Sequence, residues 1–293
     1  MNNSNRKEKD APGPGSGSGH RFLFSIDLED VRTMIPGGES FEPRVLPNTR
    51  RWLEFLQRHG ARATFFTVGN VARQYPELIR EIAQAGHELA THTSNHEPLY
   101  RQDAASLRED LRRNRNDLED LTGLPVVGFR APVFSITEKT LWAYEVLAEL
   151  GFCYSSSVLP QKALLAGWAD SPREPTRKGS GVWEVPLSLG GVGPLCAPFA
   201  GGVYFRLSPQ WLSRFLFRAA GRRGEPVISY FHPYDLDTEQ ERFQHPELGG
   251  SRVLNSLMFI GRRSLVSRLD RLITDGLQIE RYADYVRRLD AGA

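Results

Sequence analysis

Short apolar runs alternate with longer amphipathic stretches from residue 21 onward. Runs of aromatic and aliphatic residues predict strands, and apolar residues spaced three and four apart predict helices. The predicted strands are residues 21–26, 61–68, 88–90, 126–129 and 152–154, and the helices between them begin near Leu46, Asn70, Asp103 and Thr137. This alternation predicts a parallel sheet covered by helices, and at least five consecutive units favour a barrel over a doubly wound sheet.

The alternation is interrupted between residues 156 and 206, where Pro, Gly and Ser are frequent. We expect this segment to form an irregular excursion near the barrel mouth, with two β-like pieces at residues 182–185 and 203–205. The remaining predictions are a helix from Ser208-Pro209, a strand at 226–231, a polar loop at 237–256, and helices around 265–273 and 282–289. Residues 1–20 are polar or rich in Gly, Pro and Ser, so a disordered tail is expected before a single domain at 21–290.

The composition limits the classes of function. The chain has 293 residues, 40% of them hydrophobic and 25% charged, which is typical of a globular protein. A formal net charge of +2 gives no electrostatic case for nucleic acid or membrane binding. Two cysteines, Cys153 and Cys196, do not make a disulfide framework. No long apolar run or secretory signal is visible, so a soluble cytoplasmic protein is expected. No GxGxxG motif follows the first strand, which argues against a dinucleotide-binding fold.

Ionisable residues stand directly after several of the predicted strands. Asp27, Glu29 and Asp30 follow the first strand, and His92 and His96 follow the third. The residues that follow the later strands are Arg130, Ser155 and His232. Because the C-terminal ends of parallel barrel strands form one face, these side chains are expected to meet at one mouth. Each alone has a structural interpretation, as a turn cap, a salt-bridge partner or a core histidine, and their shared position favours a reaction site.

The types of residue at this mouth indicate metal-assisted hydrolysis of an amide or ester. If the segment after His92 turns as a helix, His92 and His96 lie on one face with Cβ atoms about 6 Å apart. Two imidazoles and one carboxylate can hold a divalent ion with an open position, and Zn²⁺ suits such a site best. Such an ion lowers the pKa of bound water and polarises a carbonyl oxygen. A second carboxylate can accept the proton of the water, and a histidine can protonate the leaving group.

Five segments resemble motifs of the polysaccharide deacetylases of carbohydrate esterase family 4, which share the NodB homology domain. Residues 92–96 (HTSNH) resemble the metal motif of this family, residues 129–132 (FRAP) its Arg-x-Pro motif, and residues 229–233 (SYFHP) its final motif. Residues 25–30 (SIDLED) resemble the first motif in its Asp-x-Glu-Asp form, and residues 198–206 (PFAGGVYFR) resemble a mid-chain signature. The last two forms are typical of a bacterial subgroup linked to exopolysaccharide and surface-glycan synthesis. The resemblance covers residues 21–290.

The resemblance implies a fold, an activity and roles for particular residues. The implied fold is α/β, a distorted, incomplete (β/α) barrel, and the implied protein is a zinc-dependent hydrolase that removes N-acetyl groups from sugars of a surface polysaccharide or its precursor. A glycan is therefore the expected partner, without nucleic acid and without an integral membrane segment. The implied roles are Asp27 as base, His232 as acid, Arg130 as the residue that orients the base, His92 and His96 as metal ligands, and Pro132 and Tyr204 as substrate-binding residues.

Two departures from the family pattern leave alternatives open. The third ligand is Glu29, which strand alternation places on the side of Asp27, or Asp30, which the adjacent-acid form of the motif favours. Ser155 stands where the family has an Asp that holds the arginine, so Arg130 is either loosened or held by another acid such as Asp170. This departure, with the aromatic residues Trp168, Trp183, Tyr204 and Trp211, motivates an alternative function as a catalytically weakened carbohydrate-binding protein. Hydrolysis of a non-sugar cyclic amide by the same chemistry is a further alternative.

Overall fold

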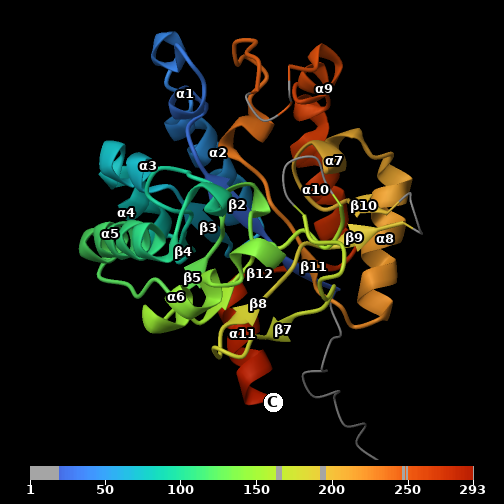
Figure 1. Ribbon diagram of the computed structural model, residues 1–293. Helices are drawn as coiled ribbons and strands as arrows, with labels where there is room; N and C mark the ends of the chain where they lie inside the picture. The colour runs from blue at the N-terminus through green and yellow to red at the C-terminus, as the bar shows by residue number, and fades with distance from the viewer. Residues whose placement is uncertain (1–19, 163–166, 192–195, 246–247, 249, 293) are drawn as a thin grey trace, which may run out of the picture.

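The centre of the molecule is a sheet of seven strands that are parallel except for β7 (Figure 1). The computed structural model describes residues 20–292 apart from 163–166, 192–195, 246–247 and 249. The strand order is β2 (Ser25–Leu28), β3 (Thr64–Thr67), β4 (Glu88–Thr91), β5 (Gly128–Phe129), β6 (Tyr154–Ser155), β8 (Trp183–Glu184) and β7 (Thr176–Arg177). A second parallel sheet has the order β11 (Val227–Ile228), β1 (His20–Leu23) and β12 (Leu277–Glu280).

The two sheets are joined because β1 and β2 are successive parts of one chain segment, separated only by Phe24. β1 pairs with β11 and β12, whereas β2 pairs with β3 on one side, and Ile26 forms a parallel bridge with Phe231 on the other. In the described part of the chain no ladder joins β7 or β8 to β11. The strands therefore form a barrel, as the alternation of elements predicts, and it stays open on that side, as the family resemblance implies.

The outer layer consists of helices that bury one apolar face against the strands (Figure 1). Helix α5 (Ala104–Thr122) shows the local causes: Asp103 accepts from the Ser106 backbone N–H in a capping box, and Gly123 ends the helix in the left-handed region. Its residues Leu107, Leu111 and Leu118 are fully buried. The other helices of this layer are α2 (Val45–Arg58), α3 (Gly69–Gln74), α4 (Pro76–Gln84), α6 (Ala143–Glu149), α8 (Gln210–Arg222) and α10 (Leu265–Thr274).

Several predicted elements differ from those observed. The strand at 21–26 is two strands, and the helix from Asn70 is divided at Pro76, which begins α4. Residues 203–205 lie in helix α7 (Gly202–Leu207), not in a strand. A Cβ atom on Gly201 would lie 2.1 Å from the Tyr230 carbonyl oxygen, so only glycine allows the close approach that starts this helix.

After residue 237 the chain contains a helix and a strand that the sequence reasoning missed. Helix α9 (Arg252–Leu257) interrupts the predicted loop at 237–256, and β12 stands between α10 and α11 (Tyr282–Ala291). Of the predicted disordered tail, residues 1–19 lie outside the described residues, and His20 already belongs to β1. None of the described helices is long and apolar enough to cross a membrane.

Candidate active site

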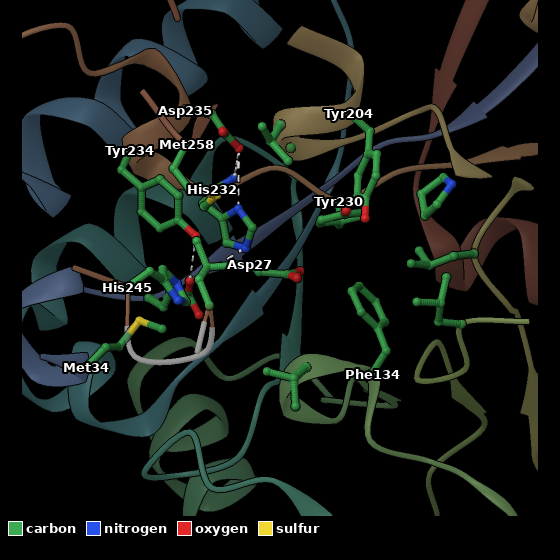
Figure 2. A pocket seen from close by; sticks show the side chains of 18 of the residues that line it. Asp27, Met34, Phe134, Tyr204, Tyr230, His232, Tyr234, Asp235, His245 and Met258 are labelled. Atoms are coloured by element: carbon green, nitrogen blue, oxygen red, sulfur yellow. Dashed lines mark hydrogen bonds and ion pairs between the residues drawn. The ribbon is translucent and has the colours of Figure 1, made fainter. Parts of the chain in front are cut away.

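The ionisable residues that follow the strands converge on a cavity of about 400 Å³. Asp27 lies in β2, Glu29 follows this strand, His92 and His96 follow β4, and His232 follows the Ile26–Phe231 bridge. All five line the cavity, part of which Figure 2 shows. The predicted gathering at one mouth is therefore observed in the structure.

Glu29, His92 and His96 form a cluster whose ligand atoms all lie within 4.8 Å of one another. Nε2 of His96 lies 2.9 Å from Oε2 of Glu29. Nδ1 of His92 lies 2.7 Å from the Arg130 carbonyl oxygen. Because that oxygen can only accept, Nδ1 of His92 carries the proton, and Nε2 keeps a lone pair for an ion. The cluster thus offers two imidazole nitrogens and one carboxylate oxygen.

Asp30, the other candidate for the third ligand, does not belong to this cluster. Its carboxylate accepts from the Arg32 backbone N–H at 3.0 Å and caps the short helix α1 (Val31–Met34). Desolvation raises the pKa of Asp30 above its ordinary value. Of the two alternatives, the structure brings Glu29 to the histidines.

The segment between His92 and His96 is a loop, so the helical turn that the spacing suggested is wrong. Thr93 and His96 have positive φ angles of 64° and 56°. Asn114 of α5 holds the loop by donating to the Thr93 carbonyl oxygen, and Asp110 accepts from the Ser94 backbone N–H at 2.7 Å. The loop still brings the two ring centroids to 4.9 Å.

The charge states in the cluster suit a cation. Burial raises the pKa of Glu29, but the facing imidazoles of His96 and His232 lower it by a larger amount. The pKa of Glu29 therefore lies below its ordinary value. Burial lowers the pKa of His92 to about 4. At neutral pH Glu29 is therefore an anion and His92 a neutral imidazole, which are the forms that bind metals.

Asp27 is buried beside the cluster and forms an ion pair with Arg130. The distance from Nη1 of Arg130 to Oδ1 of Asp27 is 2.5 Å, and both side chains are buried. The guanidinium also lies over the ring of Phe66, with its central carbon 4.0 Å from the ring centroid. This environment fixes the direction of the Asp27 carboxylate.

Arg130 is held firmly although Ser155 replaces the acid of the family pattern. Besides Asp27, it donates to Oγ of Ser25 at 2.8 Å, to Oγ of Ser156 at 3.1 Å, and to the Tyr282 hydroxyl at 2.8 Å. Asp170, suggested as a substitute acid, is exposed, and no ion pair joins it to Arg130 within the described residues. Ser155 itself donates to Oγ of Ser157 at 2.8 Å. Of the two alternatives left open, neither a loosened Arg130 nor a hold by Asp170 is observed.

Replacing Tyr282 by Phe tests this anchoring. The variant leaves one N–H of the buried guanidinium without its partner, so we expect the free energy of unfolding to fall by about 1.5–3 kcal/mol. We also expect the turnover number to fall roughly tenfold, because Asp27 depends on Arg130 for its position. Chemical denaturation and steady-state kinetics measure both effects. Tyr285→Phe, on the same helix α11, is the control, and equal behaviour of the two variants would contradict the anchoring role.

His232 lies next to Glu29 of the cluster and is held by Asp235 (Figure 2). Nδ1 of His232 lies 3.3 Å from Oδ2 of Asp235, and Nε2 lies 3.5 Å from Oε1 of Glu29. Asp235 in turn pairs with the buried Arg206 at 3.0 Å. Burial lowers the pKa of His232, but Glu29 and Asp235 raise it to a net value of about 9. His232 therefore carries a proton at neutral pH.

The two predicted substrate-binding residues have different surroundings. Tyr204 of α7 lines the cavity and is 43% exposed. Pro132 is buried and begins a short 3-10 helix, whose next residues Val133 and Phe134 line the cavity instead. Trp168, Trp183 and Trp211 do not belong to its lining.

Residue-by-residue reasoning missed the partners of the reacting side chains. Asp235 stands three positions after His232, and Arg206 ends the mid-chain signature PFAGGVYFR, so a local signal existed for both. Tyr282 has no such signal, since it reaches Arg130 only through the pairing of β12 with β1. His245, which also lines the cavity, lies in the predicted polar loop.

Comparison with known proteins agrees with this geometry. Residues 40–154 match the family model of "Polysaccharide deacetylase". This match identifies residues 40–154, the segment that contains His92, His96 and Arg130, as a polysaccharide deacetylase domain. Residues 156–285 match a second model, "Domain of unknown function (DUF3473)".

The similar curated proteins include deacetylases of several bacteria. The peptidoglycan-N-acetylglucosamine deacetylase of Bacillus cereus is 32% identical over 98 residues, which are 33% of this chain and 36% of that protein. The chitooligosaccharide deacetylase of Bradyrhizobium is 39% identical over 59 residues, which are 20% of this chain and 27% of that protein. The matched segments therefore span about a third of the length of these relatives.

Solved structures share the fold over nearly the whole chain. A candidate polysaccharide deacetylase from Mycobacterium smegmatis has a TM-score of 0.64 at 22% identity, covering 97% of this chain and 95% of that chain. Puue allantoinase has a TM-score of 0.62 at 15% identity, covering 98% of both chains. These likenesses establish the distorted, incomplete (β/α) barrel.

Proposed function

We propose that the protein is a metal-dependent deacetylase that hydrolyses the N-acetyl group of an amino sugar in a surface polysaccharide or its precursor. The observation that carries the proposal is the meeting of three units in one cavity: the Glu29–His92–His96 cluster, the Asp27–Arg130 pair and the His232–Asp235 pair. The names of the relatives support an N-acetylated glucosamine as the substrate.

The cluster has the donor set and the spacing of a site for a divalent ion. Two imidazole nitrogens and one carboxylate oxygen leave a fourth position open, and this donor set suits Zn²⁺. When bound, such an ion supplies Lewis-acid polarisation of the amide oxygen and acidifies water. Glu29, His92 and His96 are the residues that hold it in this proposal.

The other residues move the protons of the hydrolysis. Asp27 accepts a proton from the attacking water at its carboxylate, which Arg130 keeps in place. The oxygen of that water forms a bond to the acyl carbon, and the bond between this carbon and the sugar nitrogen breaks. His232, charged at neutral pH, donates its Nε2 proton to the departing nitrogen. The products are acetate and a free amino sugar.

The firm hold on Arg130 removes the main ground for a weakened, purely binding protein, because that alternative depended on the loss of the acid at Ser155. Hydrolysis of a cyclic amide rests on a shared fold alone, since Puue allantoinase is 15% identical. A substrate panel that includes allantoin separates this alternative.

The decisive experiment combines metal analysis with acetate release. The purified protein is analysed for bound transition metals and assayed on N-acetylglucosamine oligomers, with and without a chelator. We expect one ion per chain, acetate release that the chelator abolishes, and recovery on adding Zn²⁺. A protein without transition metal whose activity the chelator leaves unchanged would contradict the proposal.

A further inference from the structure

Away from the reacting residues, the wall of the cavity is apolar. Its ionisable residues are those of the site described above together with His245. Every other described lining residue is aliphatic, aromatic, glycine or proline, and within the described part of the lining there is no Asn, Gln, Ser, Thr, Lys or Arg. Apart from the tyrosine hydroxyls, these side chains offer no partner to sugar hydroxyl groups. A long glycan lying on this wall would lose hydrogen bonds to water without replacing them.

Two short helices form the part of the wall beside His232. Val203, Tyr204 and Leu207 line the cavity from α7, and Leu254, Leu257 and Met258 line it from α9 and its C-terminal end. Within each set the residues are one, three or four positions apart, so their side chains lie on one face of the helix. The two helices thus turn their apolar faces to the same cavity.

Arg206 fixes this wall to the reaction centre. Its Nη2 donates to the Met258 carbonyl oxygen at 3.0 Å, and its Nη1 donates to the carbonyl oxygen of Ile260, so it joins α7 to the end of α9. Its Nε pairs with Asp235, which holds His232. The wall is therefore built on the side of the proton donor. Because His232 serves the departing nitrogen, this is the side of the sugar and not of the acyl group.

The wall also continues to the surface of the molecule. Tyr204, Leu207 and Leu254 line the cavity, yet they are 43%, 40% and 42% exposed. An apolar chain lying along them would leave the protein at this rim. A chain that ends in water would gain little there, whereas a long lipid chain would continue into an apolar phase.

We propose that the amino sugar is carried on an aliphatic lipid, and that α7 and α9 bind the first part of this chain while the sugar lies at the cluster. This inference rests on the proposed function and specifies its substrate. It assigns to Val203, Tyr204, Leu207, Leu254, Leu257 and Met258 the recognition of an aliphatic chain attached to the sugar.

Alkyl glycosides of N-acetylglucosamine test the inference. Acetate release is compared for the methyl, hexyl and decyl glycosides, each below the concentration at which it forms micelles. Burying one methylene group should raise kcat/KM about fourfold. Two to three buried methylene groups should therefore raise kcat/KM by roughly 15- to 60-fold over the value for the methyl glycoside. Equal kcat/KM values for all chain lengths, with acetate released, would overturn the inference and leave the proposed function standing.

Two neighbouring residues of α9 provide a matched pair of variants. Leu254 lines the cavity, whereas Val253 is 73% exposed and does not belong to the lining. Leu254→Asn should lower the ratio of kcat/KM for the decyl glycoside to kcat/KM for the methyl glycoside at least about fourfold. This is the loss expected when one methylene group of the chain is no longer buried. Val253→Asn should leave this ratio unchanged. Equal ratios in the two variants would overturn the placement of the chain.

A second series places the chain on the acyl group instead. Methyl glycosides of glucosamine carrying N-acetyl, N-hexanoyl and N-decanoyl groups are compared in the same assay. If the gain follows the length of the acyl chain and not that of the glycoside, the inference is wrong. Absence of hydrolysis from both series and from N-acetylglucosamine oligomers, in the metal-loaded protein, would overturn the proposed function together with the inference.

Discussion

Glu29→Gln is expected to lose the bound metal and all measurable turnover. Glu29 gives the only carboxylate oxygen of the ligand cluster, and an amide in its place carries no charge to balance the ion. Mutating a residue that only hydrogen-bonds to a metal ligand typically lowers the metal affinity roughly 10- to 100-fold. Because Glu29 is itself a proposed ligand, the loss of affinity should be larger than that. Metal content after dialysis and competition with a chromophoric chelator measure the loss.

Asp30→Asn is the matched control, because it changes the adjacent acid in the same way. Asn caps helix N-termini about as well as Asp, so α1 keeps the bond from the Arg32 backbone N–H. This variant should bind metal and hydrolyse substrate nearly as the unchanged protein does. If Asp30→Asn lost the metal while Glu29→Gln kept it, the ligand assignment would be reversed.

Asp27→Asn should keep the metal and lower the turnover number by about 10²–10⁴. The amide oxygen can still accept from Arg130, but it cannot take the proton of the attacking water. The same substitution leaves the buried Arg130 without its counter-charge, so thermal unfolding should be followed alongside the kinetics.

His232→Ala is compared with Asp27→Asn because it removes the proposed proton donor and leaves the proposed base in place. The His232→Ala variant should also retain the metal. Its turnover number should fall less for substrates whose leaving amine is a weaker base. For the Asp27→Asn variant, the fall in the turnover number should not depend on the leaving amine in this way. A metal-free Asp27→Asn protein would refute the assignment of Asp27 as base.

The sequence predicts those parts of the fold that depend on local patterns. Helix α5 follows from its Asp103 cap, its leucine spacing and Gly123. The grouping of Asp27, His92 and His232 follows from the rule that parallel strands end at one face. Local patterns failed at residues 203–205, where aromatic and β-branched residues suggested a strand but a close approach of Gly201 to Tyr230 begins a helix.

The choice between Glu29 and Asp30, and the partners of Arg130, required the tertiary structure. Strand alternation and the adjacent-acid pattern disagreed about the ligand, and the cap on α1 decides between them. Tyr282 compensates for Ser155 from a segment more than a hundred residues away, which no spacing rule reaches. β12 is a strand of four residues between two helices, too short to stand out from its surroundings.

The partnership of Tyr282 with Arg130 also determines when the site can form during synthesis. Arg130 and Asp27 leave the ribosome long before β12 and α11, yet one edge of β1 and one N–H of the guanidinium stay unpaired until this last segment arrives. At about 5–20 residues per second, the roughly 150 residues between Arg130 and Tyr282 take on the order of 10–30 s to be made. Nascent chains therefore hold an incomplete site for most of their synthesis, with an open strand edge that can pair with another chain.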